Sequence, residues 1–128
     1  MSIPGTAFRR RLLCEALTVL AADAPDQVRW LDRYAVLADD IALDFAHAFD
    51  FVDALVDEGA LDAVTPPVLR EIDRLLGAMS GAEHADRWSR DALAVDPGWC
   101  RARSLAREVL VAELGEWRHP MPDITVIR

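Results

Sequence analysis

Glycine and proline divide this chain into segments, and each segment carries the spacing of apolar residues that is typical of an amphipathic helix. Six glycines and seven prolines fall almost entirely between these periodic segments. Apolar residues recur every three or four positions within 6–23, 25–37, 39–58, 65–79 and 97–114. We therefore expect an all-α fold, a compact single-domain bundle of five or six helices across residues 1–128, with more than half of the chain helical.

Capping residues and prolines indicate where several of these helices begin and end. Thr65 and Asp96 can each cap a helix, and each is followed by a proline, which suits a first helical turn. Gly59 and Gly115 can adopt the left-handed conformation that commonly ends a helix. After this last stop, residues 116–128 contain two prolines and a run of apolar residues, so we expect an extended C-terminal tail that docks on the bundle.

The segment from Asp26 to Glu58 contains neither glycine nor proline over 33 residues, which is long for one helix of a compact domain. We expect Asp39 or Asp40 to begin a new helix that runs to Glu58. In the preceding helix, Leu37 is expected to face the core. The apolar face of the 39–58 helix consists of Ile41, Phe45, Phe49, Val52, Leu55 and Val56.

The negative charge of the chain is concentrated in the same region. The formal net charge is −8 at pH 7, and residues 34–69 contain eight acidic residues and no arginine or lysine. A concentrated negative field repels nucleic acids and anionic membranes and attracts cationic partners. We therefore expect a basic protein partner, and neither nucleic-acid nor membrane binding. The arginines at 9–11 and 101–107 are expected to pair with the acidic helix or to lie on solvated faces.

The polar face of the 39–58 helix is the candidate functional surface. Leu43 and Phe51 lie among its carboxylates, where an amphipathic helix would carry polar residues. In one interpretation, a loop or the tail covers these two side chains and the acids are simply solvated. In the other, an aromatic anchor ringed by carboxylates docks a basic protein. The predicted partner-binding residues are Asp40, Leu43, Asp44, His47, Asp50, Phe51 and Glu58.

Two enzyme families offer an alternative use of the aspartates. The pattern Asp39-Asp40-x-x-x-Asp44 resembles the Mg²⁺-binding motif of terpene cyclases, whose larger helical barrel and second metal motif this chain lacks. In size, the chain is more similar to the all-α nucleotide pyrophosphohydrolases of the MazG-like group. Asp50-x-x-Asp53 matches their second metal-binding element, while their first element and phosphate-binding lysine are missing here. This resemblance implies a small Mg²⁺-dependent phosphohydrolase as the alternative function.

The remaining motifs do not favour catalysis. No serine, cysteine or histidine lies in a nucleophile-elbow context, and no glycine-rich phosphate loop is present. We expect no catalytic residues, no metal ligands and no cofactor. Cys14 and Cys100 are expected to be buried thiols, and the absence of a secretory signal or a membrane span predicts a cytoplasmic protein. The favoured function is a non-enzymatic protein-binding module, for example an immunity- or antitoxin-like inhibitor of a basic protein.

Overall fold

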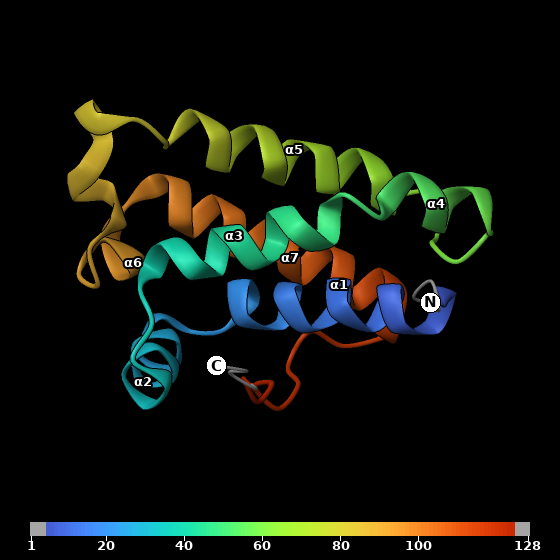
Figure 1. The fold of residues 1–128 in the computed structure, drawn as a ribbon, viewed down its shortest axis with the longest axis horizontal. Coiled ribbons are helices and arrows are strands. Elements are labelled where there is room, and N and C mark those ends of the chain that lie inside the picture. Colours follow the sequence, from blue (N-terminus) through green and yellow to red (C-terminus); the bar gives the residue numbers. More distant parts are fainter. Residues whose placement is uncertain (1–4, 125–128) are drawn as a thin grey trace.

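The computed structural model describes residues 5–124, which form a helical bundle without strands (Figure 1). Within this range the bounds are α1 Thr6–Ala21, α2 Ala24–Tyr34, α3 Ala38–Phe49, α4 Val52–Asp57, α5 Thr65–Ala78, the 3₁₀ helix η1 Ala82–Trp88, α6 Ala92–Val95 and α7 Pro97–Leu114. The predicted all-α class is confirmed. The helical segments exceed the expected number because the 39–58 helix is broken and residues 82–95 add two short helices.

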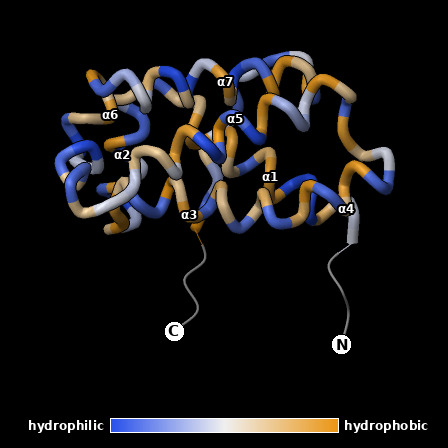
Figure 2. The backbone as a smooth tube through the Cα atoms, turned by 90° about the horizontal axis from the view of Figure 1, so that it is seen from above, coloured by the Kyte–Doolittle hydropathy of each residue, from blue (hydrophilic) through white to orange (hydrophobic). Residues whose placement is uncertain are grey.

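The four longest helices enclose the core. The helix α7 packs against α1 and α5, and α3 closes the ring by packing against the same two helices. Figure 2 shows hydrophobic and hydrophilic residues alternating along the helices, as expected for amphipathic helices that share one core. Almost fully buried side chains come from all four: Leu17 and Leu20 in α1, Ile41 and Phe45 in α3, Leu69 and Ile72 in α5, and Leu105 and Val109 in α7.

The long predicted helix is interrupted at Asp50 and Phe51, between α3 and α4. The N–H of Phe51 donates to the carbonyl oxygen of Ala48 at 3.1 Å, a three-residue spacing that tightens the backbone where an α-helix would span four residues. This turn changes which side chains of α4 face inward. Leu55 remains buried, but Val56, which was expected in the core, is 46% exposed.

The connection between α2 and α3 also differs from the prediction. Ala35 ends α2 in the left-handed conformation with φ 53°, although it is not a glycine. The chain turns there, and Leu37 is 65% exposed instead of facing the core. The N–H of Leu37 donates to the carboxylate of Asp40 at 2.8 Å, which fixes the first turn of α3. Trp30, by contrast, is 5% exposed and belongs to the core.

One of the two predicted caps forms as expected. The carboxylate of Asp96 accepts a hydrogen bond from the N–H of Gly98 at 2.7 Å and begins α7, which ends at Gly115 with φ 85°. Thr65 does not cap α5 but lies within its first turn. Its buried hydroxyl donates to the carboxylate of Glu113 at 2.5 Å, so tertiary contact with α7 replaces the expected local one.

The described part of the tail contacts α2 and α7 without forming a helix. The indole N–H of Trp30 donates to the carbonyl oxygen of Pro122 at 2.9 Å, and the hydroxyl of Tyr34 donates to Asp123 at 2.8 Å. The guanidinium of Arg107 lies 3.7 Å from the centre of the Trp117 ring. These contacts hold the tail to the bundle as far as residue 124, and residues 125–128 lie outside the described range.

Candidate functional site

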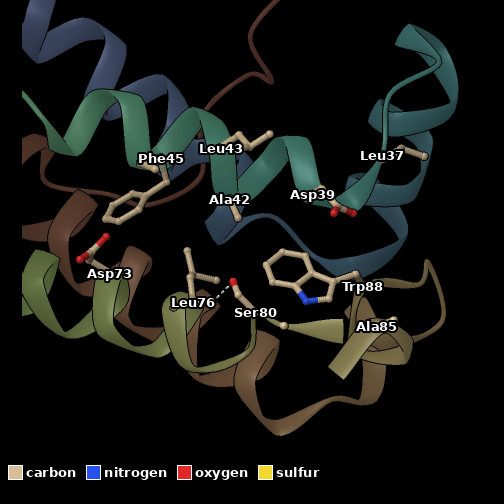
Figure 3. A pocket seen from close by; sticks show the side chains of 13 residues that line it. Leu37, Asp39, Ala42, Leu43, Phe45, Asp73, Leu76, Ser80, Ala85 and Trp88 are labelled. Carbon is tan, nitrogen blue, oxygen red and sulfur yellow. Dashed lines mark hydrogen bonds between the residues drawn. The ribbon is translucent and has the colours of Figure 1, made fainter. Parts of the chain in front are cut away.

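Two grooves flank α3 and divide the predicted binding surface between them. The larger, of about 710 Å³, lies between α3 on one side and α5 and η1 on the other, and we name it the α3–α5 groove (Figure 3). The smaller, of about 390 Å³, is bordered by α1, α3 and residues 122–124, and we name it the α3–tail groove. Leu43 lines the first groove, whereas Asp44, His47 and Phe51 line the second.

Small side chains form part of the floor of the α3–α5 groove. Ala42 and Ala46 lie one turn apart on α3, and Gly77 lies opposite on α5, so little side-chain volume fills the space between the two helices. Trp88 of η1 stands at one end of the groove. Its indole N–H donates to the carbonyl oxygen of Met79 at 2.8 Å, which fixes the ring as a wall of the groove.

Two large hydrophobic side chains remain exposed at this groove. Leu37 is 65% exposed and Leu43 is 51% exposed. A single exposed leucine is ordinary on a protein surface, but a cluster of apolar side chains around a groove marks an interaction site. Burying such a side chain is favourable by up to about 2 kcal/mol, so both leucines can contribute to docking.

Acidic residues surround the groove without an arginine that balances them. The charged residues that line it are Asp39 and Asp73, and Figure 3 shows them near opposite ends. Within residues 5–124, no arginine or histidine forms an ion pair with Asp39, Asp44, Asp50 or Asp73. The negative charge on this side of the bundle is therefore free to interact with a cationic partner.

The carboxyl group of Asp44 also lies in surroundings that disfavour its negative charge. Partial desolvation of its carboxyl group raises the pKa of Asp44 above 3.8, and the neighbouring carboxylate of Asp40 raises this pKa further, while His47 opposes the shift. A raised pKa means that the surroundings disfavour the ionised carboxylate. A docked cation would have the opposite effect, because a nearby positive charge favours the ionised form.

Phe51 lines the α3–tail groove and is partly buried there. Its side chain is half-buried in the α3–tail groove, with His47 on the same side and Pro122 and Ile124 of the tail across from it. The tail borders the same groove as Phe51, while Leu43, which the first interpretation also expected to be covered, is left exposed. Of the two hydrophobic residues among the carboxylates, Leu43 is the one available to a partner.

Asp40 and Glu58, two of the predicted binding residues, make contacts inside the monomer. Asp40 accepts the N–H of Leu37 at the start of α3, as described above. Glu58 accepts hydrogen bonds from Thr6 and from Arg9, both on α1. The pair of Arg9 and Glu58 is an example of the expected pairing between an arginine and the acidic segment. These two carboxylates are consequently less available to a partner than those of Asp44 and Asp50.

The residues of the groove outside α3 were not indicated by the sequence. Asp73 and Gly77 read as ordinary members of the outward face of α5, and Trp88 lies in a segment whose apolar spacing is irregular. Their proximity to α3 depends on how the helices pack, which sequence periodicity does not specify. The signal that could have drawn attention to α5 is Gly77 itself, a glycine inside a periodic helical segment.

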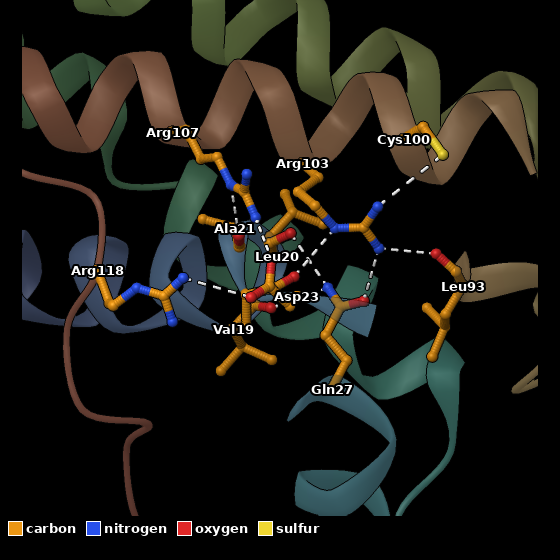
Figure 4. Close-up of polar contacts among 11 residues, drawn as sticks. Val19, Leu20, Ala21, Asp23, Gln27, Leu93, Cys100, Arg103, Arg107 and Arg118 are labelled. Carbon is orange, nitrogen blue, oxygen red and sulfur yellow. Dashed lines mark hydrogen bonds and ion pairs between the residues drawn. The ribbon is translucent and has the colours of Figure 1, made fainter. Parts of the chain in front are cut away.

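Arg103 of α7 stabilises the end of α1 and is not part of an open basic surface (Figure 4). Its guanidinium donates to the carbonyl oxygen of Ala22 and to the side-chain oxygen of Gln27, both at 3.0 Å. The buried amide of Gln27 in turn donates to the carbonyl oxygens of Val19 and Leu20 at 2.9 and 3.1 Å. Carbonyl groups at a helix C-terminus lack partners within the helix, and these side chains supply them.

Arg107 completes the same cluster. It donates to the carbonyl oxygen of Ala21 and to the carboxylate of Asp23, both at 2.9 Å. Arg118 of the tail reaches the other oxygen of Asp23 at 3.3 Å. The hydrogen bond from Arg107 is the main reason that the pKa of Asp23 is lowered from 3.8. The cluster joins α1, α7 and the tail, and we assign it a structural role.

The aspartates do not gather into a metal centre in the described part of the chain. Across residues 5–124, no group of three or more histidine, cysteine, aspartate or glutamate residues is arranged to hold a metal ion. Asp50 and Asp53, which matched one element of the MazG-like pattern, lie on either side of the start of α4. Within this range, the phosphohydrolase alternative therefore lacks an assembled group of metal ligands.

Comparisons with known proteins assign no family to this chain. The chain matches no protein-family profile, and no match is found among curated proteins or among solved structures. None of the helices within residues 5–124 is long and apolar enough to cross a membrane.

Proposed function

We propose that the protein is a non-enzymatic binding module that docks a basic protein partner on the exposed acidic side of α3. The observation that carries the proposal is the exposed side chain of Leu43 beside carboxylates without ion-pair partners, Asp39 and Asp44 above all. In such an arrangement, the charges raise the association rate, and burial of the apolar side chain slows dissociation.

An immunity- or antitoxin-like inhibitor of a basic nuclease is the most specific form of the proposal. A nuclease binds phosphate groups through a cationic surface, and a small acidic protein can cover that surface. At a rise of 1.5 Å per residue, Asp39 and Asp50 lie about 16 Å apart along the helix direction. Carboxylates spread over this length can contact several cationic side chains at once, as an inhibitor of this kind requires.

The test compares the proteins captured by three forms of the chain. The first is the wild type, and the second carries Asp39→Asn, Asp44→Asn and Asp50→Asn. A charge-matched control carries Asp86→Asn, Asp91→Asn and Glu108→Gln, which are exposed residues on η1, before α6 and on α7. Asp40 is left intact because it holds the first turn of α3.

The proposal predicts a basic partner that the wild type and the control retain and that the α3 variant binds at least about tenfold more weakly. Isothermal titration with the purified partner supplies the affinities. An acidic or neutral partner that all three forms retain equally would contradict the proposal.

A further inference from the structure

We infer that the α3–α5 groove binds an amphipathic α-helix of the partner, with apolar side chains against Leu43 and Trp88 and cationic side chains towards Asp39 and Asp73. This inference rests on the proposed function and names the shape of the partner's binding segment, which charge alone does not determine. The groove has the required composition, because its walls are mainly apolar and its charged lining residues are both acidic.

The length of the groove suits two turns of a helix. On α3 its lining residues extend from Asp39 to Ala46, and opposite them from Asp73 and Gly77 of α5 to Ser80, just beyond the end of that helix. The stretch on α3 covers about 10 Å at a rise of 1.5 Å per residue. A bound helix presents side chains at positions i, i+4 and i+7 over the same length, so three apolar anchors can enter the groove together.

The backbone chemistry of the groove also favours a helix over an extended peptide. An extended segment gains much of its affinity by hydrogen bonding to the edge of a sheet. The groove is formed between helices, and residues 5–124 contain no strand that could offer such an edge. A helix satisfies its own backbone groups and can enter an apolar groove without leaving them unpaired.

The small floor residues allow a helix to approach closely. Ala42 and Ala46 present single methyl groups, and Gly77 presents none. An added side-chain carbon at Gly77 would meet no other atom within 4 Å. This open space is what an incoming side chain of the partner would occupy, and it makes Gly77 a position from which the groove can be blocked without disturbing the core.

The charge of the chain argues against a second copy as the occupant. The net charge is −8, and a symmetric pairing of two α3–α5 grooves would bring Asp39 and Asp73 of both copies together. Like charges that face each other without cations repel. A partner with arginine or lysine flanking its apolar residues would instead place opposite charges at both ends of the groove.

The experiment uses two synthetic peptides of the same composition, each about 14 residues long, or four helical turns. Both contain leucine, arginine and alanine. In one, the leucines recur at i, i+4 and i+7 with arginines flanking them, and in the other the leucines alternate with other residues. Fluorescence anisotropy measures the affinity of each peptide for the full-length protein and its variants.

Two variants locate the binding site. Gly77→Met places a side chain in the groove, and Ala78→Met places the same side chain at the next position of α5, which is exposed and does not line the groove. Circular dichroism checks that both variants keep the thermal stability of the wild type. Sedimentation velocity records the oligomeric state of all three proteins.

We expect the helical-pattern peptide to bind at least about tenfold more tightly than its isomer, and Gly77→Met, but not Ala78→Met, to remove that preference. Equal binding of both peptides, weakened in each case by the three α3 substitutions, would overturn the helix inference while leaving the proposed function in place. No measurable binding of either peptide would overturn the helix inference, and partner capture by the wild type would decide the proposed function separately. A wild-type dimer that Gly77→Met dissociates would assign the groove to a second copy and would likewise overturn the inference.

Discussion

Leu43 and Phe51, the two hydrophobic residues among the carboxylates of residues 39–58, line different grooves on the two sides of α3. Leu43 is 51% exposed at the α3–α5 groove, whereas Phe51 is half-buried beside the tail. The break between α3 and α4 passes through Phe51 and contributes to this difference. An anchor for a partner is therefore to be sought at Leu43, and Phe51 is expected to act on the stability of the monomer.

Phe51→Ala is expected to lower the free energy of unfolding by about 2 kcal/mol, roughly half the cost of truncating a fully buried phenylalanine. The loss is expected because the side chain is partly buried in the α3–tail groove, so that its truncation exposes apolar surface of the bundle to water. Urea denaturation followed by circular dichroism gives this free energy. A variant as stable as the wild type, with weaker binding to the partner, would show instead that Phe51 is the anchor.

Leu43→Ala is expected to show the opposite pattern. Because the side chain is exposed, the free energy of unfolding should change by no more than about 0.5 kcal/mol. Affinity for the partner should fall at least about tenfold, mainly through faster dissociation. Surface plasmon resonance separates the two rate constants, and Val95→Ala, at a residue that is 76% exposed and does not line the groove, serves as the control.

Arg103→Met is expected to destabilise the fold by about 2 kcal/mol or more. The substitution removes the guanidinium that donates hydrogen bonds to Ala22 and Gln27, and it leaves these buried acceptors unpaired. Arg101→Met provides the matched control, since Arg101 forms an exposed pair with Glu71. Exposed pairs of this kind contribute at most about 1 kcal/mol. Equal losses in urea denaturation of the two variants would contradict the structural role of the cluster around α1.

Asp44→Asn is expected to stabilise the protein at neutral pH. The pKa of Asp44 is raised above 3.8 in the folded state by desolvation and by Asp40, so its ionised form weakens folding at every pH above that folded pKa. As the pH falls through the folded pKa the penalty disappears, and the variant and the wild type should converge. Urea denaturation at a series of pH values measures this difference.

Asp96→Asn tests how a lowered pKa, instead of a raised one, makes stability depend on pH. Hydrogen bonds from Arg87 and Gly98 lower the pKa of Asp96 from 3.8, so its contribution to stability is complete above that value and is lost as the pH falls through the folded pKa. This variant should be less stable than the wild type at neutral pH. The difference in the free energy of unfolding between the two proteins should become smaller in acid. A difference that does not change with pH would contradict the lowered pKa of Asp96.

Local signals in the sequence predicted both ends of α7, although the cap expected at Thr65 does not form. Asp96 caps α7, and Gly115 ends it in the left-handed conformation, because both effects are built into the chemistry of single residues. The break at Asp50 and Phe51 has no such signal, since neither residue is a helix breaker. The helix that follows the break, α4, packs against α1, and this tertiary contact is information that the local sequence does not contain.

The candidate site was predictable on α3 and not on its neighbours. The excess of carboxylates and the outward position of Leu43 follow from composition and helical spacing. That Asp73 and Trp88 complete a groove beside Leu43 follows from the packing of α5 and η1, which no periodicity within a single segment determines. That Leu43 and Phe51 line different grooves likewise depends on where the tail lies, which the sequence does not specify.

The central claim, that the exposed acidic side of α3 docks a basic partner, is tested most directly by the association rate constant as a function of salt concentration. Stopped-flow measurements with the captured partner would compare the wild type, the variant with Asp39→Asn, Asp44→Asn and Asp50→Asn, and the charge-matched control. We predict that the rate constants of the wild type and the control fall steeply with added salt, because ions screen long-range attraction. The α3 variant should associate at least about tenfold more slowly at low salt and depend less on salt. Equal association rates and equal salt dependence for all three proteins would contradict the account.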